Sequence, residues 1–284
     1  MDRRQVTNTT LFQQRDCSKP ALPIPENEMS LARRRDLELY VHRVYDFGLS
    51  PYKASLAGQR FCGIKRILDV GCGPGQWAIA AAELYTHALV IGVDTERTLL
   101  DHAVRFAREH HVNNCHFVAA SYEDLLRLFP AGSFDLIMCH SVLQYVDESK
   151  AIQIFSALLR RGGMLLMHWN HGFGYYLSRF ISHLLRHEYT QSIYPLRILF
   201  VEPLRRFFVG TISPDHFVTF GRLRRLAAKE DILLQRIPVE PLLDYQDGPW
   251  GISKVFSCRG IKKSAFHQSA AARASIKTRQ SLSH

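Results

Sequence analysis

The middle of the chain alternates short apolar runs with longer runs whose apolar residues recur at helical spacing. The short runs lack the polar residue at every second position that a half-exposed strand shows, so we expect strands buried on both faces. Such strands, with a helix between each pair, are typical of a parallel sheet covered by helices on both sides. The expected strands are residues 66–70, 88–94, 115–120, 134–140 and 162–169, and the expected helices between them are residues 75–85, 97–111, 123–129 and 150–160.

Segments with other patterns flank this alternation. Residues 1–28 mix polar residues with prolines and are expected to be poorly ordered. Residues 29–57 carry an apolar stripe at helical spacing, which predicts an N-terminal helix. Residues 171–215 are rich in aromatic residues and arginine, which favours one or two amphipathic helices inserted above the sheet.

The C-terminal part returns to helix and strand patterns. We expect a helix over residues 220–230 and two closing strands within 232–240 and 253–260. The expected fold class is therefore α/β, with a doubly wound, mostly parallel, seven-stranded sheet, helices on both faces and a helical lid insertion after the fifth strand. The main domain is expected to span residues 29–260, followed by a disordered basic tail over residues 261–284.

Composition narrows the class of protein. The 284 residues are 46% hydrophobic and 22% charged, which is ordinary for a globular protein. No apolar run reaches the roughly 18 residues of a membrane-spanning helix, and the N-terminus lacks the apolar core of a secretory signal. The six cysteines show no paired spacing, so we expect reduced thiols and a cytoplasmic location.

The net charge of +10 is unevenly distributed. Residues 61–170 carry 9 Lys and Arg against 11 Asp and Glu, whereas residues 171–230 carry 9 against 4 and residues 259–284 carry 6 against none. This basic surplus could attract nucleic acid, an anionic lipid surface or an acidic substrate. A solvated surface with a loose tail explains it equally well.

A glycine-rich turn, "DVGCGPG" at residues 69–75, joins the first strand of the alternation to its first helix. A strand, a glycine turn and a helix bring backbone N–H groups to the carboxyl edge of a parallel sheet, where ligands bind. The spacing is G-x-G-x-G, and Gln76 stands where a dinucleotide-binding G-x-G-x-x-G would have its third glycine. Asp69, in front of the glycines, would repel a pyrophosphate and suits a ligand ammonium group.

Polar residues also follow the next three strands. Asp94 ends the second strand, where a carboxylate can accept both hydroxyls of a ribose. "SYED" at residues 121–124 follows the third strand, where an adenine could be read, and Cys139 and His140 end the fourth. A ligand with an amino acid end, a ribose and an adenine matches this order. S-adenosylmethionine has those parts and needs no phosphate cradle.

At these residues the sequence resembles the class I S-adenosylmethionine-dependent methyltransferases, whose fold is Rossmann-like. The matching segments are "ILDVGCGPGQWAIAAA", "VIGVD", "AASYEDL", "FDLIMCHSVLQYV" and "LLRRGGMLLM", in the family's order over residues 64–169. The resemblance implies a methyltransferase with S-adenosyl-L-methionine as its cofactor. The implied cofactor-binding residues are Asp69, Gly71, Cys72, Gly73 and Gly75 around the methionine moiety, Asp94 and Thr95 at the ribose, Ser121, Tyr122 and Glu123 at the adenine, and Cys139 under the sulfonium.

The sequence departs from the family's pattern in two places. At "RRGG", residues 160–163, relatives often have "RPGG", which affects only a turn. The other place is Ser121. Many members have an acidic residue where this chain has Ser121, so the adenine could be read by the Tyr122 backbone instead. A chain that keeps the fold without the cofactor is disfavoured, because Asp69, the three glycines and Asp94 are all present.

Histidines at the carboxyl ends of the fourth and fifth strands are candidates for a general base, which an acceptor hydroxyl or protonated amine requires. The candidate catalytic residues are His140 and His168, and the candidate substrate-binding residues are Tyr145, His171, Tyr175 and Tyr176. The alternative for each is a histidine hydrogen-bonded into the cleft wall or an aromatic ring that only packs. No metal is expected, because His110, His111 and His116 lack metal-ligand spacing.

The resemblance leaves the methyl acceptor open. We expect a small molecule that attacks through oxygen, nitrogen or a carboxylate. The alternative is a transfer RNA methyltransferase acting on a carboxymethoxy-type group of a wobble uridine, because "FDLIMCHSVLQYV" and "LLMHWNHGFG" look somewhat like the bacterial enzymes of that kind. The resemblance implies that substrate choice comes from segments added to the common core, here the helix of residues 29–57 and residues 171–215. Residues 171–215 could be a lid over the acceptor, an RNA-binding surface or a peripheral membrane contact, with a packed lid and solvated arginines as the simplest alternative.

Overall fold

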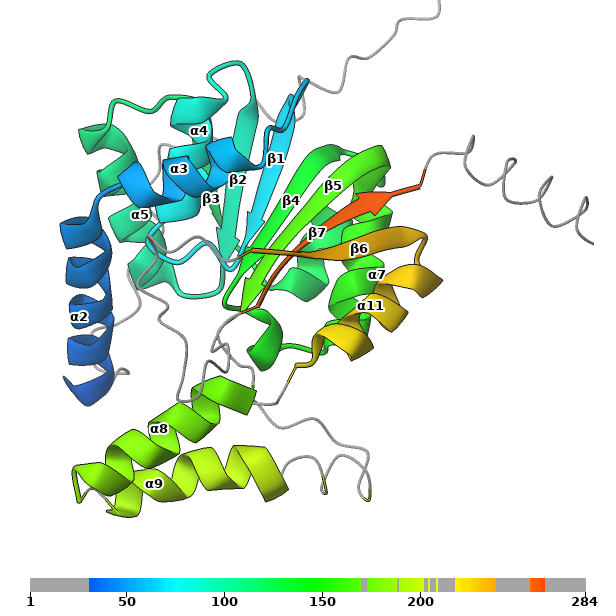
Figure 1. Cartoon of the computed structure of the whole chain (residues 1–284). Helices are drawn as coiled ribbons and strands as arrows, with labels where there is room; N and C mark the ends of the chain where they lie inside the picture. Colours follow the sequence, from blue (N-terminus) through cyan, green and yellow to red (C-terminus); the bar gives the residue numbers. More distant parts are fainter. Residues whose placement is uncertain are drawn as a thin grey trace, which may run out of the picture.

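The computed structural model describes residues 31–169, 173–187, 189–201, 204, 208, 218–238 and 256–263. Within them a seven-stranded sheet has the strand order β3-β2-β1-β4-β5-β7-β6 (Figure 1). The strands are β1 (Arg66–Val70), β2 (Leu89–Asp94), β3 (Cys115–Ala119), β4 (Phe134–His140), β5 (Leu159–Trp169), β6 (Ile232–Ile237) and β7 (Phe256–Lys262). Neighbouring strands from β3 to β5 pair in parallel, and β7 is antiparallel to both β5 and β6. The α/β class and the mostly parallel sheet are thus confirmed.

Helices cover both faces of this sheet. The described helices of the chain are α2 (Leu31–Phe47), α3 (Ser50–Gly58), α4 (Gln76–Leu84), α5 (Arg97–Glu109), α6 (Leu125–Leu128), α7 (Glu148–Leu158), α8 (Phe173–Leu185), α9 (Tyr189–Leu196) and α11 (Phe220–Lys229), with the short helices η1 (Tyr122–Asp124), η2 (Leu143–Tyr145) and η3 (Arg197–Val201), and α8, α9 and η3 lie beyond the sheet. Buried residues of α3, α4 and α5 form one core with one face of the strands, and those of α6, α7 and α11 form a second core with the other face.

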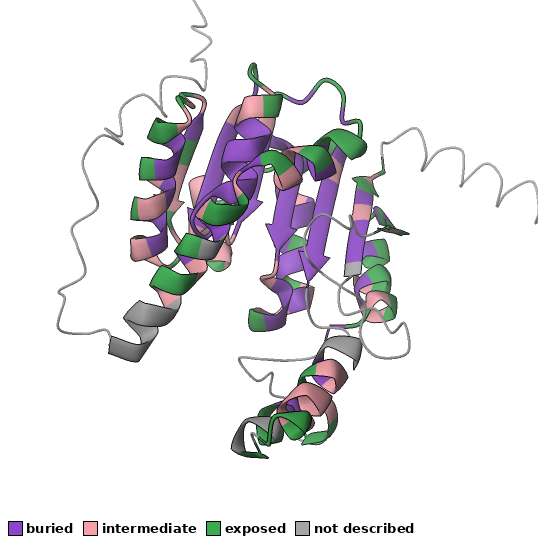
Figure 2. Ribbon diagram, turned by 60° about the vertical axis from the view of Figure 1, so that its left-hand side comes forward, coloured by how far each residue is buried: buried purple, intermediate pink, exposed green. Residues whose placement is uncertain are grey.

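The two cores explain why the strands are apolar throughout. Ile67 of β1 packs into the core that contains α4, and its neighbour Leu68 packs into the core that contains α7. Successive side chains of a strand point to opposite faces, so both must be apolar when helices cover both faces. Figure 2 shows the strands buried between their helices. The chain runs outward to β3 and then returns to place β4 beside β1, which creates a crevice at the carboxyl ends of these two strands.

The N-terminal helical stretch is two helices. α2 ends at Phe47, and Gly48 follows with φ +62° and donates from its N–H to the carbonyl oxygen of Tyr45 over 3.0 Å. Pro51 then occupies the first turn of α3. A glycine with positive φ ends a helix, and a proline fits the start of the next one.

Two strands extend beyond their expected bounds. β5 begins at Leu159, before the expected start at residue 162. β7 continues through Lys262, past the expected end of the main domain, because Ile261 pairs with Met164 and Lys262 with Ile232. Residues 1–28, expected to be poorly ordered, lie outside the described residues, as does the expected disordered tail from residue 264 onward.

Candidate functional site

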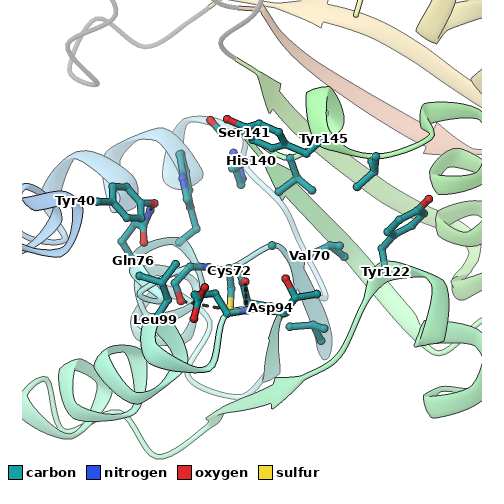
Figure 3. Close-up of a pocket in the computed structure, with 18 of the residues that line it drawn as sticks. Tyr40, Val70, Cys72, Gln76, Asp94, Leu99, Tyr122, His140, Ser141 and Tyr145 are labelled. Atoms are coloured by element: carbon teal, nitrogen blue, oxygen red, sulfur yellow. Dashed lines mark hydrogen bonds between the residues drawn. The ribbon is translucent and has the colours of Figure 1, made fainter. Parts of the chain in front are cut away.

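A cavity of about 1100 Å³ opens at the carboxyl edge of the sheet, over the crevice between β1 and β4 (Figure 3). Its floor comes from the ends of β1, β2, β4 and β5 and the loops that follow β1, β3 and β4, and α2 and α3 form its roof. The described lining residues are Leu37, Tyr40, Val44, Phe47, Tyr52, Val70, Gly71, Cys72, Gly73, Gln76, Trp77, Val93, Asp94, Thr95, Glu96, Leu99, Ala120, Ser121, Tyr122, His140, Ser141, Val142, Gln144, Tyr145, Val146 and His168.

The glycine loop is held against the end of β2. The N–H groups of Gly71 and Cys72 donate to the carbonyl oxygen of Val93 over 2.7 and 3.1 Å. Gly71 has φ +71°, and a Cβ added there would collide with Cγ2 of Val142 in the loop after β4. Gly73, with φ +54°, passes under the ring of Tyr40. Gly71, Cys72 and Gly73 all lie on the cavity wall, as the sequence predicts.

Gly75 has a different position from its two partners. It is the left-handed residue before α4, with φ +87°, and it does not line the cavity. An added Cβ would lie 2.9 Å from Cβ of Ala103 and 3.0 Å from the ring of Phe117. The third glycine therefore lets the loop pack against α5 and β3.

Asp94 joins the loop to the end of β2. Its carboxylate accepts the N–H of Gly73 over 2.8 Å through Oδ2 and the N–H of Glu96 over 2.9 Å through Oδ1. Each carboxylate oxygen can accept a second hydrogen bond, so the group can still receive a ligand hydroxyl. Thr95 and Glu96 lie beside it on the wall, and the side chains of Val93 and Leu99 add apolar surface.

Asp69 lies deeper than its place before the loop suggests. It is 1% exposed and does not line the cavity, and its Oδ2 has no hydrogen-bond partner among the described residues. Burial, followed by the negative charge of Asp94, raises the pKa of Asp69 to about 8, although the backbone N–H of Ala78 in α4 acts in the opposite direction. Because this carboxyl does not reach the cavity wall, its contact with a ligand ammonium group stays a prediction.

Of the three residues in the loop after β3 that were expected at the adenine, two line the cavity and one does not. Ser121 and Tyr122 lie on the wall beside Ala120. Glu123 is exposed instead, and its carboxylate forms an ion pair with Nζ of Lys150 at 2.7 Å. Ser121, which replaces the acidic residue of many family members, stabilises the start of η1. Its hydroxyl accepts the N–H of Glu123 over 3.3 Å and caps that short helix.

The two candidate catalytic histidines lie together at the ends of β4 and β5, with ring centroids 6.0 Å apart. The His140 ring stacks on Trp77 of α4 at 3.8 Å and 4°, and its two nitrogens have no hydrogen-bond partner among the described residues. Nδ1 of His168 is 2.6 Å from the Ser257 hydroxyl on β7. Burial and the neighbouring His168 hold the pKa of His140 well below its usual value, and burial lowers the pKa of His168 to about 4. Both rings are therefore neutral at pH 7.

The residue after His140 has an unusual backbone. Ser141 adopts φ +58°, which is uncommon for a residue other than glycine. Its N–H donates to the carbonyl oxygen of His168 over 2.6 Å, which joins the ends of β4 and β5 inside the cavity. Cys139, one position earlier, is fully buried and does not line the cavity. The resemblance implied that Cys139 lies under the sulfonium, but it is the two residues after it, His140 and Ser141, that line the cavity.

The residues expected to bind substrate are scattered. Tyr145 lines the cavity and is 58% exposed, so it stands at the rim. Tyr176 is fully buried in α8, where its ring lies 6.4 Å from that of Tyr194, and it does not line the cavity. His171 and the side chain of Tyr175 lie outside the described residues.

The resemblance gave the segment of residues 29–57 a part in substrate choice, but the sequence assigned no site role to individual residues of the roof or to two amides beneath it. Tyr40 of α2 accepts a hydrogen bond from Nε2 of Gln76 over 3.2 Å, and Tyr52 of α3 meets Trp77 edge to face at 5.0 Å. Gln144 is 1% exposed, and its Oε1 has no partner among the described residues. The available signal was the apolar stripe of residues 29–57, which also fits simple packing.

The described wall is apolar and aromatic apart from a few polar groups. Its charged residues are Asp94 and Glu96, and no Lys or Arg lines it in the part of the chain that the structure describes. The backbone of the glycine loop, the free acceptor capacity of Asp94 and the apolar surface at Val93, Leu99 and Ala120 suit a methionine chain, a ribose and an adenine in turn. A negative wall also suits a sulfonium or ammonium charge.

Comparison with known proteins places this geometry in a family. Residues 67–163 match the family described as "Methyltransferase domain". The ubiquinone biosynthesis O-methyltransferase of Coxiella burnetii is 33% identical over 141 residues, which cover 46% of this chain and 58% of that protein. The uncharacterized methyltransferase YcgJ of Bacillus subtilis is 33% identical over 103 residues, 36% of this chain and 39% of that protein. The chain spans about half the length of the curated relatives it matches.

Solved structures agree on the fold. The crystal structure of Bacillus subtilis YcgJ superposes with a TM-score of 0.50 at 18% identity, over 76% of this chain and 99% of that one. An O-methyltransferase family protein from Burkholderia thailandensis superposes with a TM-score of 0.54 at 12% identity, over 83% of this chain and 61% of that one. The chain therefore carries a class I S-adenosylmethionine-dependent methyltransferase domain with the Rossmann-like fold.

Proposed function

We propose that the protein transfers the methyl group of S-adenosylmethionine to an oxygen or nitrogen of a small, uncharged acceptor. The observation that carries this proposal is the composition of the cavity wall. Its acceptor side is aromatic and apolar, with Tyr40, Phe47 and Tyr52 above and Trp77 and His140 below, and no described lining residue carries a positive charge. A phosphate or carboxylate would enter this space without a cationic partner, at a considerable desolvation cost.

The glycine loop, Asp94 and the wall around Tyr122 would hold the cofactor. When bound, S-adenosylmethionine supplies a methyl group already activated by the positive charge on sulfur. The main task of the protein is then to hold the acceptor in line with that methyl group, and such alignment can supply several kcal/mol. The roof residues on α2 and α3 add aromatic and apolar surface around this space.

His140 is the group best placed to take a proton from an acceptor hydroxyl. Its nitrogens are unpartnered among the described residues, and the flat stack on Trp77 fixes the plane of its ring. Since the ring is neutral at pH 7, it can accept the hydroxyl proton. His140 would hold this proton, which leaves the acceptor oxygen free to take the methyl group.

The test is a two-part assay of methyl transfer from labelled S-adenosylmethionine. Wild-type protein is incubated with a panel of small phenols and amines, and separately with bulk unmodified transfer RNA. We expect label in small molecules and none in RNA. Label that enters only the transfer RNA would contradict the proposed acceptor class.

A variant separates the role of His140 from cofactor binding. His140→Asn should lower kcat by about 100-fold or more, because general-base catalysis contributes on that scale, while the Kd for S-adenosylmethionine changes little. His116→Asn, an exposed histidine on β3, is the matched control and should behave as wild type. An unchanged kcat in His140→Asn would remove the base assignment and leave the acceptor class to the label experiment.

A further inference from the structure

The helical hairpin formed by α8, α9 and η3 exposes an unusual amount of apolar surface. Leu185 is 75% exposed, Ile193 is 64% exposed and Phe200 is 61% exposed. The other large exposed apolar residues of this segment are Leu184, Tyr189, Tyr194 and Val201, and Leu204 and Phe208 continue the series beyond η3. Large exposed apolar side chains gathered in one segment point to an interaction site.

The hairpin uses only a small part of its apolar surface to hold itself together. α8, α9 and η3 pack chiefly against one another, around the buried side chains of Tyr176 and Ile198. Figures 1 and 2 both show the hairpin projecting beyond the carboxyl ends of the parallel strands, clear of the main body. A flat surface can therefore approach it without meeting the rest of the domain.

The charge of the same segment indicates which kind of surface this is. Residues 173–208 contain five arginines and two glutamates, whereas residues 61–170 are slightly acidic. Arg179, Arg186 and Arg197 are all exposed on the hairpin. Exposed aliphatic and aromatic side chains interleaved with arginine fit the interface of an anionic bilayer, where apolar groups enter the acyl boundary and guanidinium groups meet the headgroups.

We propose that the hairpin of α8, α9 and η3 binds the surface of an anionic lipid bilayer. Among the described residues no helix is long and apolar enough to cross a bilayer, so the contact is with one leaflet. A second copy of the chain would not need the arginine surplus. An RNA surface would use the arginines and aromatic rings but gains little from exposed Leu185 and Ile193. The combination of exposed apolar side chains with arginines favours a lipid surface. This proposal does not depend on the identity of the methyl acceptor.

The experiment measures co-flotation of the full-length chain with vesicles. One set of vesicles is pure phosphatidylcholine, and in the other about a third of the lipid is phosphatidylglycerol. Wild-type protein should bind the anionic vesicles at low salt and bind the neutral ones much more weakly. Leu185→Ser/Ile193→Ser should weaken binding by roughly tenfold or more, and Arg186→Ala by about fivefold.

Matched controls show that the loss is specific to the hairpin. Leu233→Ser on β6 removes a side chain that is 55% exposed, and Arg224→Ala removes an exposed arginine on α11. Both should bind vesicles as wild type does. All variants should keep the wild-type Kd for S-adenosylmethionine, which shows that they fold.

Three results would overturn the proposal. They are absence of binding to anionic vesicles at low salt, equal binding by the hairpin variants, and equal loss in the controls. A dimer in light scattering that Leu185→Ser/Ile193→Ser dissolves, without vesicle binding by the wild type, would assign the surface to a second copy. Hairpin-dependent binding of transfer RNA without vesicle binding would assign it to RNA.

Discussion

Gly71 and Gly63 have nearly the same backbone conformation, with φ +71° and +66°, but different surroundings. A Cβ at Gly63 would meet nothing within 4 Å, whereas one at Gly71 would collide with Val142. The strain of alanine at positive φ is therefore common to both positions. What differs is the close approach of the glycine loop to the loop after β4, inside the proposed cofactor site.

The two glycines give a matched pair of variants. Gly63→Ala should cost about 1 kcal/mol of unfolding free energy and leave the Kd for S-adenosylmethionine unchanged. Gly71→Ala carries the same backbone strain, and its added methyl group must also displace the loop or Val142. The Kd of this variant for S-adenosylmethionine should therefore rise by roughly tenfold or more. Calorimetric titration of both variants checks this, and equal affinities would show that the loop geometry does not shape the site.

The sequence pattern predicted the glycine loop but not the structural role of each residue in it. Gly71 and Gly73 line the cavity as expected, while Gly75 packs against Ala103 and Phe117. Glycine spacing shows where the chain turns, but it does not show which turn residue meets a ligand and which meets a neighbouring helix. Ser141 gave no signal, because its positive φ arises from a hydrogen bond to β5 that is distant in sequence.

At the scale of elements, α2 forms part of the roof of the site and packs against α5. Tyr45 anchors it, since its hydroxyl donates to the carbonyl oxygen of His102 over 2.9 Å and its ring lies 4.3 Å from that of Phe106 in α5. Tyr40, one turn earlier, reaches the glycine loop from the same helix. The position of the roof thus depends on a residue outside the cavity.

Tyr45→Ala should therefore affect binding from a distance. Removing a half-buried aromatic ring should lower the unfolding free energy by about 2 kcal/mol and raise the KM for the methyl acceptor several-fold, because Tyr40 loses its support. Tyr45→Phe removes only the hydroxyl and should cost about 1 kcal/mol. Denaturant unfolding and steady-state kinetics measure the two effects. A KM that is the same in both variants and in wild type would show that α2 is not part of the acceptor site.

The elements of the alternating region were predictable, whereas for the roof only its helical character was. Five short apolar runs gave β1 to β5 with small boundary shifts, because burial on both faces forces each residue to be apolar. The stripe on residues 29–57 predicted helices but not their partner. A helical stripe shows that one face is buried, and it leaves open whether a sheet or a ligand lies beneath.

At the scale of the whole molecule, His168 joins two segments that are far apart in the sequence. It lies on β5, and its hydrogen-bonding partner Ser257 lies on β7, the strand inserted between β5 and β6. Burial lowers its pKa from 6.5 to about 4, so the unfolded chain binds a proton there more readily than the folded chain does. The stability from a neutral His168 is fully present above pH 6.5 and is lost as the pH falls towards 4.

This gives a pH dependence for the whole domain. Across that window the wild-type protein should lose about 3 kcal/mol of unfolding free energy from this group. His168→Gln cannot take up the proton, so its stability should fall less steeply over the same range. Urea unfolding at several pH values compares the two. Parallel curves would show that His168 titrates alike in the folded and unfolded chains.

The sheet topology and the cofactor were predictable at this scale, because five motifs in order specify one arrangement of strands. The acceptor was not, because the cavity roof and the hairpin after β5 are additions to the common core. The basic surplus noted in residues 171–230 is spread over the hairpin and α11, outside the described cavity wall. A count of charged residues along the sequence could not show that these basic residues lie on the surface and away from the cavity wall.

The most direct test of the account is a calorimetric titration of the wild-type chain with S-adenosylmethionine and, separately, with NADH. The glycine loop, Asp94 and the wall at Tyr122 should bind one S-adenosylmethionine per chain, and NADH should give no binding heat, because its pyrophosphate would lie against the negative end of the cavity. Binding of NADH, or no binding of S-adenosylmethionine, would contradict the assignment of the cavity as a methyltransferase site.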